Sequence, residues 1–224
     1  MLARVSNSRG DGLGNAHRPG GWGHRGGICS DTCIGLRTLV CISALEVPEL
    51  LIASESVLLR PFTIDDVAAV TEACQDPEIS RWTASIPWPY SEEDAAGWIS
   101  SQPAARAEGR ALSMAITVQG PHRLAGSVGL ESFDWDFRTA QAGYWVAAPE
   151  RGKGVATSAL RALTDWGFDC LNLSLITLVT LVGNTASERV AENARFDMVG
   201  EVTDYRHPQS PESSHHVKVW SLPA

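Results

Sequence analysis

The sequence predicts an α+β protein with one mixed sheet, and three observations lead to this class. Its 224 residues, 44% of them hydrophobic, suffice for one sizeable core. Apolar residues recur at helical spacing after Gly154, while the runs 112–119 and 123–135 consist largely of strand formers. Along the chain the predicted order is a strand, two helices, three strands, a helix, a strand, a helix and two strands. This order predicts helices packed against a mixed sheet.

The first elements of the domain are predicted to be a strand and two capped helices. A short apolar run from residue 56 leads into a helix opened by Thr63 and Asp66, which have capping-box spacing, and Pro77 prevents its continuation. A second helix starts at Ser91, three residues before Asp94. The stripe of the first helix that we expect to be buried consists of Val67, Val70 and Cys74.

Three strands and a long helix follow. Gly120-Pro121 separates the runs 112–119 and 123–135, as expected for a hairpin, and a third strand over 141–148 ends at Pro149. The helix after Gly154 has the clearest amphipathic pattern in the chain. Its predicted core-facing residues are Ala156, Ala159, Leu160, Leu163 and Trp166.

The last elements are a strand, a short helix and two paired strands. The continuous apolar run 173–182 predicts a central strand that is buried on both faces. Thr185 and Glu188 are predicted to cap a helix that runs to about Ala194. The runs 199–206 and 215–222 alternate like paired strands around a polar loop that contains proline.

Residues 1–50 are predicted to form a disordered or irregular extension, and residues 51–224 the folded domain. Nine of the 20 glycines lie within residues 1–45, which show no sustained period of 2 or 3.6. The histidines and cysteines of this stretch match no familiar zinc spacing, so we expect no metal site. An alternative is that translation starts near Val47 or Leu50 and that the earlier residues are a start-site artefact.

Charge and cysteine content bear on partners and compartment. The net charge is −8, and because residues 1–45 carry five arginines and two aspartates (+3), the rest carries −11. An acidic body argues against nucleic-acid binding and suits a cationic partner, although solubility alone explains most acidic surfaces. The five cysteines are scattered and predict no disulfide framework. We therefore expect the protein to reside in the reducing cytoplasm. The longest apolar runs have strand length, so we expect a soluble protein without a membrane span.

A glycine-rich turn, residues 151–157 ("RGKGVAT"), precedes the long helix. We call it the glycine turn. Such a turn offers unpaired backbone N–H groups and the positive end of the helix dipole, so it predicts an anion site. The spacing is wrong for a P-loop, and Thr157 stands where a dinucleotide fingerprint requires glycine. An alternative is that Gly152 and Gly154 simply end a loop.

The glycine turn resembles the cofactor motif R/Q-x-x-G-x-G/A of the GNAT superfamily of N-acetyltransferases, through Arg151, Gly154 and Ala156. The segment "GNTASERVAENARF" is similar to the second cofactor motif of this superfamily, N-x-x-S followed by a helix and a phenylalanine. The segments "LLRPFTIDDV" and "DPEISRW" are similar to the RimJ/RimL-like subgroup, which acetylates protein N-termini. The resemblance covers about residues 56–222. One departure is Arg195, where the family usually has glycine.

The resemblance implies a mostly antiparallel GNAT-like sheet flanked by helices, with acetyl-CoA as cosubstrate and no metal. Two strands, by position 144–147 and 175–182, are implied to diverge so that pantetheine lies in the gap. Alternatives are a solvated loop role for Lys153 and a turn or helix-cap role for Asn184. The implied cofactor-binding residues are Trp145, Val146, Arg151, Gly152, Lys153, Gly154, Val155, Ala156, Thr157, Asn184 and Ser187.

Acetyl transfer to an amine needs a polarised thioester carbonyl, a base and a proton for the departing thiolate. The resemblance implies that the N–H near Val146 polarises the carbonyl. The tyrosine that many members place seven residues after the motif asparagine is Ala191 here, so Ser187 inherits the acid role by resemblance. Glu131 is the candidate base, with Asp134 and Glu201 as rivals.

Trp82, Trp88 and Tyr90 lie in a segment that in similar proteins lines the acceptor side of the cleft. They are candidates for substrate binding, the alternative being that they cover the core. The leading hypothesis is an N-acetyltransferase that transfers the acetyl group of acetyl-CoA to a primary amine, of a protein N-terminus or a small molecule, in a ternary complex. A non-catalytic acyl-CoA-binding sensor or interaction module is the alternative. A cytoplasmic monomer or homodimer is expected.

Overall fold

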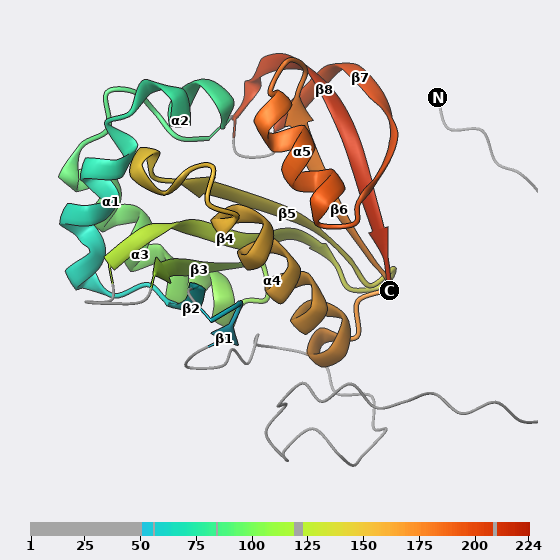
Figure 1. Ribbon diagram of the computed structural model, residues 1–224, viewed down its shortest axis with the longest axis horizontal. Helices are drawn as coiled ribbons and strands as arrows, with labels where there is room; N and C mark the ends of the chain where they lie inside the picture. Colours follow the sequence, from blue (N-terminus) through green and yellow to red (C-terminus); the bar gives the residue numbers. More distant parts are fainter. Residues whose placement is uncertain (1–50, 56, 84, 119–122, 208–209) are drawn as a thin grey trace, which may run out of the picture. The chain divides into compact units, whose positions relative to one another are not determined.

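The described residues of the computed structural model form one eight-stranded sheet with helices on both faces (Figure 1). The structure describes residues 51–55, 57–83, 85–118, 123–207 and 210–224, so the predicted extension and the Gly120-Pro121 turn lie outside it. In spatial order the strands are β1 (Leu51–Ile52), β2 (Val57–Pro61), β3 (Ala111–Val118), β4 (Arg123–Asp134), β5 (Thr139–Val146), β6 (Leu175–Leu181), β8 (Ser210–Pro223) and β7 (Asp197–His207).

Neighbouring strands are antiparallel except for β5 and β6, which are parallel. The predicted mixed, mostly antiparallel sheet is therefore confirmed. Short 3-10 turns at Ile64–Asp66 and Ala148–Glu150 accompany the helices. The helices are α1 (Val67–Cys74), α2 (Pro77–Trp82), α3 (Glu92–Ala107), α4 (Val155–Leu171) and α5 (Thr185–Asn193).

Both predicted caps are present: Thr63 opens the 3-10 turn that leads into α1, and Ser91 is the N-cap of α3. The Asp66 carboxylate accepts a hydrogen bond from the Thr63 N–H at 2.9 Å and is paired with Arg60 at 2.7 Å. At α3, the Ser91 hydroxyl accepts from the Asp94 N–H at 3.1 Å. Both short polar side chains thus occupy backbone groups that a helix start leaves without intrahelical partners.

Helix α2 was not predicted, because Pro77 indicated only the end of α1. The same proline begins α2, since its missing N–H costs nothing in a first turn. Asp76 is the N-cap, and its carboxylate accepts from the Glu78 N–H at 3.0 Å. Trp82 consequently lies at the end of a helix.

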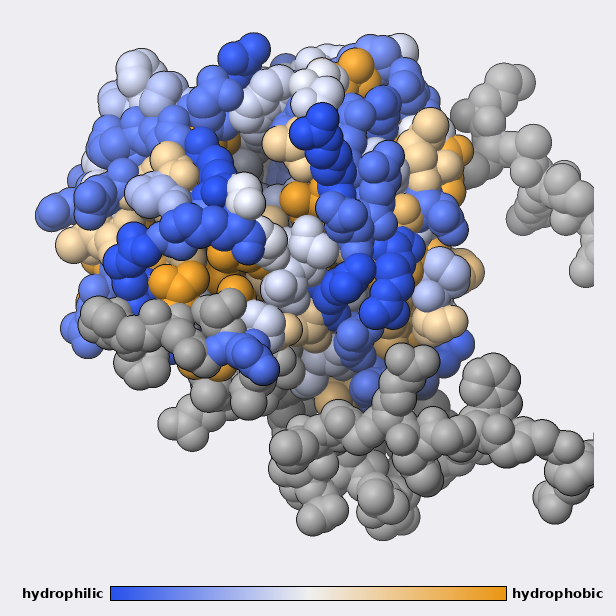
Figure 2. Space-filling model, in the orientation of Figure 1, coloured by the Kyte–Doolittle hydropathy of each residue, from blue (hydrophilic) through white to orange (hydrophobic). Residues whose placement is uncertain are grey.

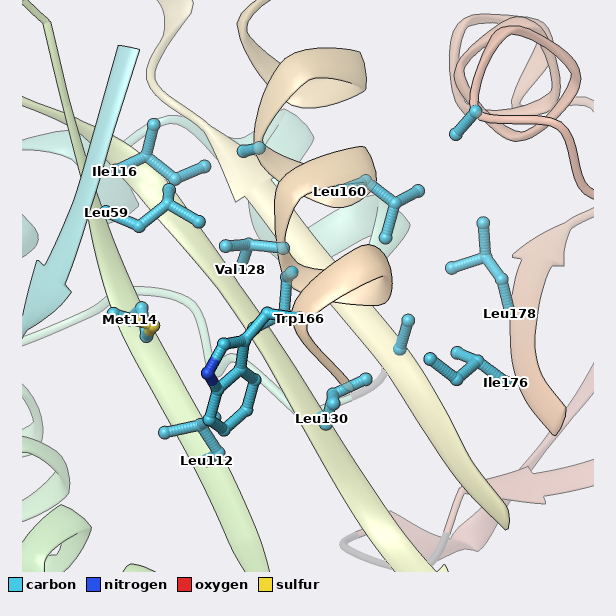
Figure 3. Packing of buried hydrophobic residues seen from close by; sticks show 14 of the residues in the cluster. Leu59, Leu112, Met114, Ile116, Val128, Leu130, Leu160, Trp166, Ile176 and Leu178 are labelled. Carbon is cyan, nitrogen blue, oxygen red and sulfur yellow. The ribbon is translucent and has the colours of Figure 1, made fainter. Parts of the chain in front are cut away.

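Two cores pack against opposite faces of the sheet. Helix α4 buries Ala159, Leu160, Leu163 and Trp166 as predicted, together with Val155 in place of the half-buried Ala156 (Figure 3). Helices α1, α2 and α3 cover the other face, where Val70, Cys74, Ile79 and Ile99 lie in one cluster with Trp145.

Strand β6 is not buried on both faces as expected. Ile176, Leu178 and Thr180 are buried, whereas the alternate residues are only half-buried. The end of β6, from Leu178 to Leu181, borders the cleft described below.

Helix α5 has a different cap from the predicted one. The N-cap is Asn184, whose side-chain oxygen accepts from the Ser187 N–H at 3.1 Å, and Thr185 is already the first helical residue. At the other end, Arg195 adopts a φ of 70°. This left-handed conformation is the one that glycine tolerates best, so it agrees with the family's usual glycine at this position.

Replacement of Leu160, which is fully buried between α4 and the sheet, is expected to destabilise the fold. We expect Leu160→Ala to lower the free energy of unfolding by about 3 kcal/mol, because it removes apolar contacts and leaves a cavity. Asp165→Ala, on the exposed side of the same helix, should change it by less than about 0.5 kcal/mol. Urea unfolding of both variants is the measurement, and equal effects would contradict the packing described here.

Candidate active site

A cleft of about 920 Å³ adjoins the point where β5 and β6 separate. The parallel pairing runs only from Thr139 with Leu175 to Ala142 with Leu178, although β5 continues to Val146 and β6 to Leu181. The ends of both strands line the cleft, together with the starts of α4 and α5 and parts of α1, α2 and α3. This confirms that the two strands diverge, as the resemblance implied.

Most of the predicted site residues line this cleft, and two do not. Lys153 is paired with Glu150 at 3.2 Å, and the half-exposed Trp88 donates from its indole N–H to the Gln75 carbonyl at 3.4 Å; neither lines the cleft. The rival bases Asp134 and Glu201 do not line it either. Those that do are Trp82, Tyr90, Glu131, Trp145, Val146, Arg151, Gly152, Gly154, Val155, Ala156, Thr157, Asn184 and Ser187.

All residues of the glycine turn except Lys153 line the cleft. Gly152 and Gly154 have φ values of 74° and 78°, which glycine adopts without strain. The first helical hydrogen bond of α4 runs from the Ser158 N–H to the Gly154 carbonyl at 3.0 Å. Within the part of the chain that the structure describes, no protein group accepts from the N–H groups of residues 152–157. The turn is therefore available to an anion.

Opposite charges fix the base of the glycine turn. The Glu150 carboxylate is buried and pairs with Lys153 and Arg123, whose own side chains are more than half exposed. Burial opposes ionisation of Glu150, but hydrogen bonds and charge attraction from Lys153 and Arg123 outweigh it and hold the pKa of the carboxyl below its ordinary value. Lys153 is thus engaged by the protein rather than directed into the cleft.

Arg151 connects three elements. Its Nε–H donates to the Val146 carbonyl at 2.9 Å, and its terminal nitrogen pairs with the Asp76 carboxylate at 2.8 Å. Because Asp76 caps α2, this guanidinium ties the start of α2 to the end of β5 and to the glycine turn. A planar guanidinium suits such a bridge better than a lysine ammonium does.

The backbone of Val146 faces the gap between the strands. The Ala147 N–H donates to the Ala125 carbonyl at 2.8 Å, toward β4. Since N–H groups of successive residues in a strand point to opposite edges, the Val146 N–H points toward the side from which β6 has separated. Its direction suits the carbonyl-polarising role that the resemblance implied.

Tyr144 is a site residue that the sequence reasoning missed. Its hydroxyl lies 2.6 Å from the Ser187 hydroxyl, and both residues line the cleft. Burial raises the pKa of Tyr144 to about 12, against a smaller opposite effect of the hydrogen bond with Ser187, so the phenol stays protonated near neutral pH. The signal was its place in the strand before the glycine turn, but only the fold brings it next to α5.

A second polar group lies on the β7 side of the cleft. Glu131 on β4 is within 3.3 Å of His207 on β7, and the Gln141 amide donates to the Tyr205 hydroxyl at 3.3 Å. His207 and Tyr205 were not predicted, because they come from a strand distant in sequence. Together these side chains surround the candidate base Glu131.

The predicted aromatic residues occupy different surroundings. Trp82 donates from its indole N–H to Glu78 at 2.8 Å, and the Arg81 guanidinium lies 4.7 Å from its ring centroid. Tyr90 is buried in the core beneath α1 and α3 and lines the cleft as well. Trp82 and Tyr90 therefore combine packing with access to the cleft.

In the residues described, no helix is long and apolar enough to span a membrane, and no cluster of three or more His, Cys, Asp or Glu is placed to hold a metal.

The surface over α4 and α5, on the face of the molecule shown in Figure 2, is mainly hydrophilic.

Comparisons with known proteins identify the family. The model of the acetyltransferase (GNAT) domain matches residues 56–197. The chain therefore belongs to the GNAT acetyltransferase family, and at the level of this family the prediction of an acetyl-CoA-dependent N-acetyltransferase is confirmed. An uncharacterized N-acetyltransferase of Bacillus licheniformis, p20, is 27% identical over 152 residues, which are 68% of this chain and 85% of that protein.

Solved structures of the same fold include RimL, RimJ and MccE. RimL, a ribosomal L7/L12 α-N-protein acetyltransferase in complex with coenzyme A, has a TM-score of 0.70 at 18% identity over 78% of this chain and 98% of RimL. RimJ of Mycobacterium smegmatis in complex with CoA-disulfide has a TM-score of 0.67 and is 24% identical. The match covers 78% of this chain and 85% of RimJ. The microcin C7 self-immunity acetyltransferase MccE, in complex with acetyl-CoA and AMP, has a TM-score of 0.70 and is 18% identical. The match covers 82% of this chain and 99% of MccE.

The buried charge of Glu150 is expected to make stability depend on pH. Because the pKa of Glu150 is lowered in the folded protein, its contribution is present above the ordinary value of 4.5 and is lost as the pH falls through the lowered pKa. Glu150→Gln should therefore be less stable than the wild type at about pH 7, and the difference should shrink at about pH 3.

Urea unfolding at both pH values measures this difference. Glu108→Gln, which alters an exposed pair with Arg110, is the matched control and should show little effect at either pH. If Glu150→Gln lowers the free energy of unfolding as much at low pH as at neutral pH, the stabilisation does not come from the charge of Glu150.

Proposed function

We propose that the protein transfers the acetyl group of acetyl-CoA to a primary amine by direct attack in a ternary complex. The observation that carries this proposal is the glycine turn, which lines the cleft where β5 and β6 separate; the N–H groups of its residues 152–157 have no acceptor among the described residues. The family assignment supports it. The coenzyme A and acetyl-CoA complexes of RimL and MccE support the choice of cosubstrate.

The residues of the cleft fit the parts of acetyl-CoA. Gly152 and Gly154 have no side chains, the Lys153 side chain is held by Glu150, and the turn lies at a helix N-terminus, so it suits the diphosphate. The unpaired edge of β5 beyond Ala142 suits the amides of the pantetheine arm, and the Val146 N–H suits the thioester carbonyl. Acetyl-CoA supplies an activated acetyl group; the protein binds and orients it.

The side chains around the gap divide the proton transfers between them. The Ser187 hydroxyl, hydrogen-bonded to Tyr144, provides a proton for the departing thiolate. Glu131, supported by His207, accepts a proton from the attacking amine. An α-amino group has a pKa of roughly 8, so part of it is already neutral at pH 7 and a weak base suffices.

The acceptor is proposed to be the amine of a protein N-terminus or of a small molecule. The RimL name specifies an α-amino group of a ribosomal protein, and the MccE complex contains AMP. The net charge of −8 favours a cationic acceptor over nucleic acid. Cytoplasmic location and the monomeric or homodimeric state remain predictions.

A non-catalytic acyl-CoA sensor is the second candidate, and the alanine at position 191 favours it. Acetyl-CoA and a panel of peptides X-Ala-Ala-Arg, in which X is each amino acid in turn, separate the two functions, with spermidine as a small amine. We expect thiol release and an acetyl group on the peptide α-amine by mass spectrometry. A sensor would show thermal stabilisation by acetyl-CoA without thiol release.

Ser187→Ala is expected to reduce kcat by about 100-fold, and Tyr144→Phe by about tenfold, because each removes part of the proton supply to the thiolate. The dissociation constant for acetyl-CoA should stay within about twofold of the wild type. Ser101→Ala on α3, whose hydroxyl bonds only within its own helix among the described contacts, is the control. Wild-type kcat in Ser187→Ala would move the acid role elsewhere.

Gly154→Glu is expected to weaken acetyl-CoA binding by more than about 100-fold, because it strains a φ of 78° and places a negative charge where phosphate is proposed to bind. Gly183→Glu is the matched control, since Gly183 has a φ of 92°, is exposed and does not line the cleft. Calorimetric titration with acetyl-CoA is the measurement. An unchanged affinity in Gly154→Glu would remove the turn from the site.

A further inference from the structure

Gly143, in the middle of β5, is a glycine that the fold itself does not require. A Cβ built at this position meets no atom within 4 Å, and its φ lies outside the left-handed region. Gly126 and Gly129 on β4 differ, because a Cβ there would lie 2.2 Å from the Trp145 carbonyl oxygen and 2.6 Å from the Leu112 carbonyl oxygen. Sterics therefore explain the glycines of β4 but not the glycine of β5.

Glycine weakens a strand interior, since it adds backbone entropy to the unfolded chain and contributes no side chain to packing. Gly143 borders open space in a cleft, and sterics do not require a glycine there. This combination indicates that the space accommodates part of a ligand. Gly143 and its neighbours on β5 all line the cleft. The empty volume at Gly143 thus belongs to the site and not to the core.

The surroundings of Gly143 form a floor without side chains. The register pairs Gly143 with Gly129, so two glycines face each other across β4 and β5. On the same face, the next pair in one direction is Gln141 with Glu131. In the other direction it is Ser127 with Trp145. The floor is therefore bordered by a carboxylate and an amide at one end and by an indole and a hydroxyl at the other.

This floor lies on the opposite face of β5 from the glycine turn. Successive side chains alternate between faces, so Tyr144 lies on the other side, where it reaches Ser187 of α5. Val146 lies on that side too and packs in the same core as Val155 at the start of α4. Trp145, on the face of Gly143, packs instead in the cluster of α1 and α3. The two faces thus separate a cofactor side from a second compartment.

We propose that Gly143 is a specificity-determining residue that, opposite Gly129, keeps this floor open for the carbon that bears the acceptor amine. The inference rests on the proposed acetyl transfer and places the acceptor on the face opposite the glycine turn. Glu131, one pair along the floor, gives this end the charge that attracts a cationic amine. A side chain on residue 143 would occupy the space of the acceptor and leave the donor site untouched.

Gly143→Ala tests the proposal, because folding and acceptor binding respond in opposite directions. We expect a melting temperature equal to or above that of the wild type and a dissociation constant for acetyl-CoA within about twofold. The kcat/KM for Ala-Ala-Ala-Arg should fall at least about tenfold, and that for Gly-Ala-Ala-Arg, with less bulk beside the amine, should fall less. Gly143→Val, which has a larger side chain, should lower kcat/KM for both peptides further.

Gly97→Ala is the matched control. Gly97 lies in the middle of α3, is exposed, meets no atom within 4 Å of an added Cβ and does not line the cleft. This variant should gain stability in the same way and retain wild-type kcat/KM for both peptides.

Three results would overturn the inference: wild-type kcat/KM in Gly143→Ala, a lowered melting temperature, which would show a packing role, or weakened acetyl-CoA binding, which would assign the floor to the donor. If the wild type acetylates none of the peptides, the proposed function fails separately. In that case calorimetric titration of Ala-Ala-Ala-Arg into the coenzyme A-saturated wild type and Gly143→Ala still decides whether residue 143 borders an acceptor site.

Discussion

The separation of β5 from β6 is the constraint on which the site depends. Each strand keeps one paired edge along its whole length: β4 pairs with β5 as far as Val146, and β8 pairs with β6 as far as Leu181. Because these outer ladders persist, the facing edges part after Ala142 without destabilising the sheet. The backbone groups left on the β5 edge are those proposed to bind the pantetheine arm, and α4 and α5 both start beside the opening.

Electrostatics set the position of the glycine turn relative to this opening. Glu150 is buried and held by two cations at the base of the turn, and Arg151 reaches from the turn to the Val146 carbonyl and to Asp76. The motif arginine therefore serves the architecture of the site: it joins the cap of α2 to the strand end whose N–H faces the thioester in the proposed complex. A displacement of α2 would be transmitted to β5 through one guanidinium.

The sequence was informative wherever local chemistry decides structure. Helix starts at Thr63 and Ser91, the α4 stripe and the glycine turn follow from spacing alone. The partner that a side chain chooses did not follow: Lys153 bonds Glu150, three residues earlier, and Trp88 bonds the backbone of Gln75 outside the cleft. Tyr144 and His207 were missed for the same reason, since their partners lie on α5 and β4, and no periodic pattern encodes which strands meet.

The surroundings of residue 191 weaken the case for a non-catalytic binder. Ala191 is fully buried in the core beside Phe196, so a tyrosine side chain there would have to displace packed atoms. The phenol that this position lacks is supplied by β5 instead, where Tyr144 contacts the hydroxyl of Ser187 in the same cleft. A proton donor depends on where its oxygen lies and not on which element carries it. The alanine is therefore compatible with the proposed transfer, in which Ser187 and Tyr144 hold the proton for the thiolate.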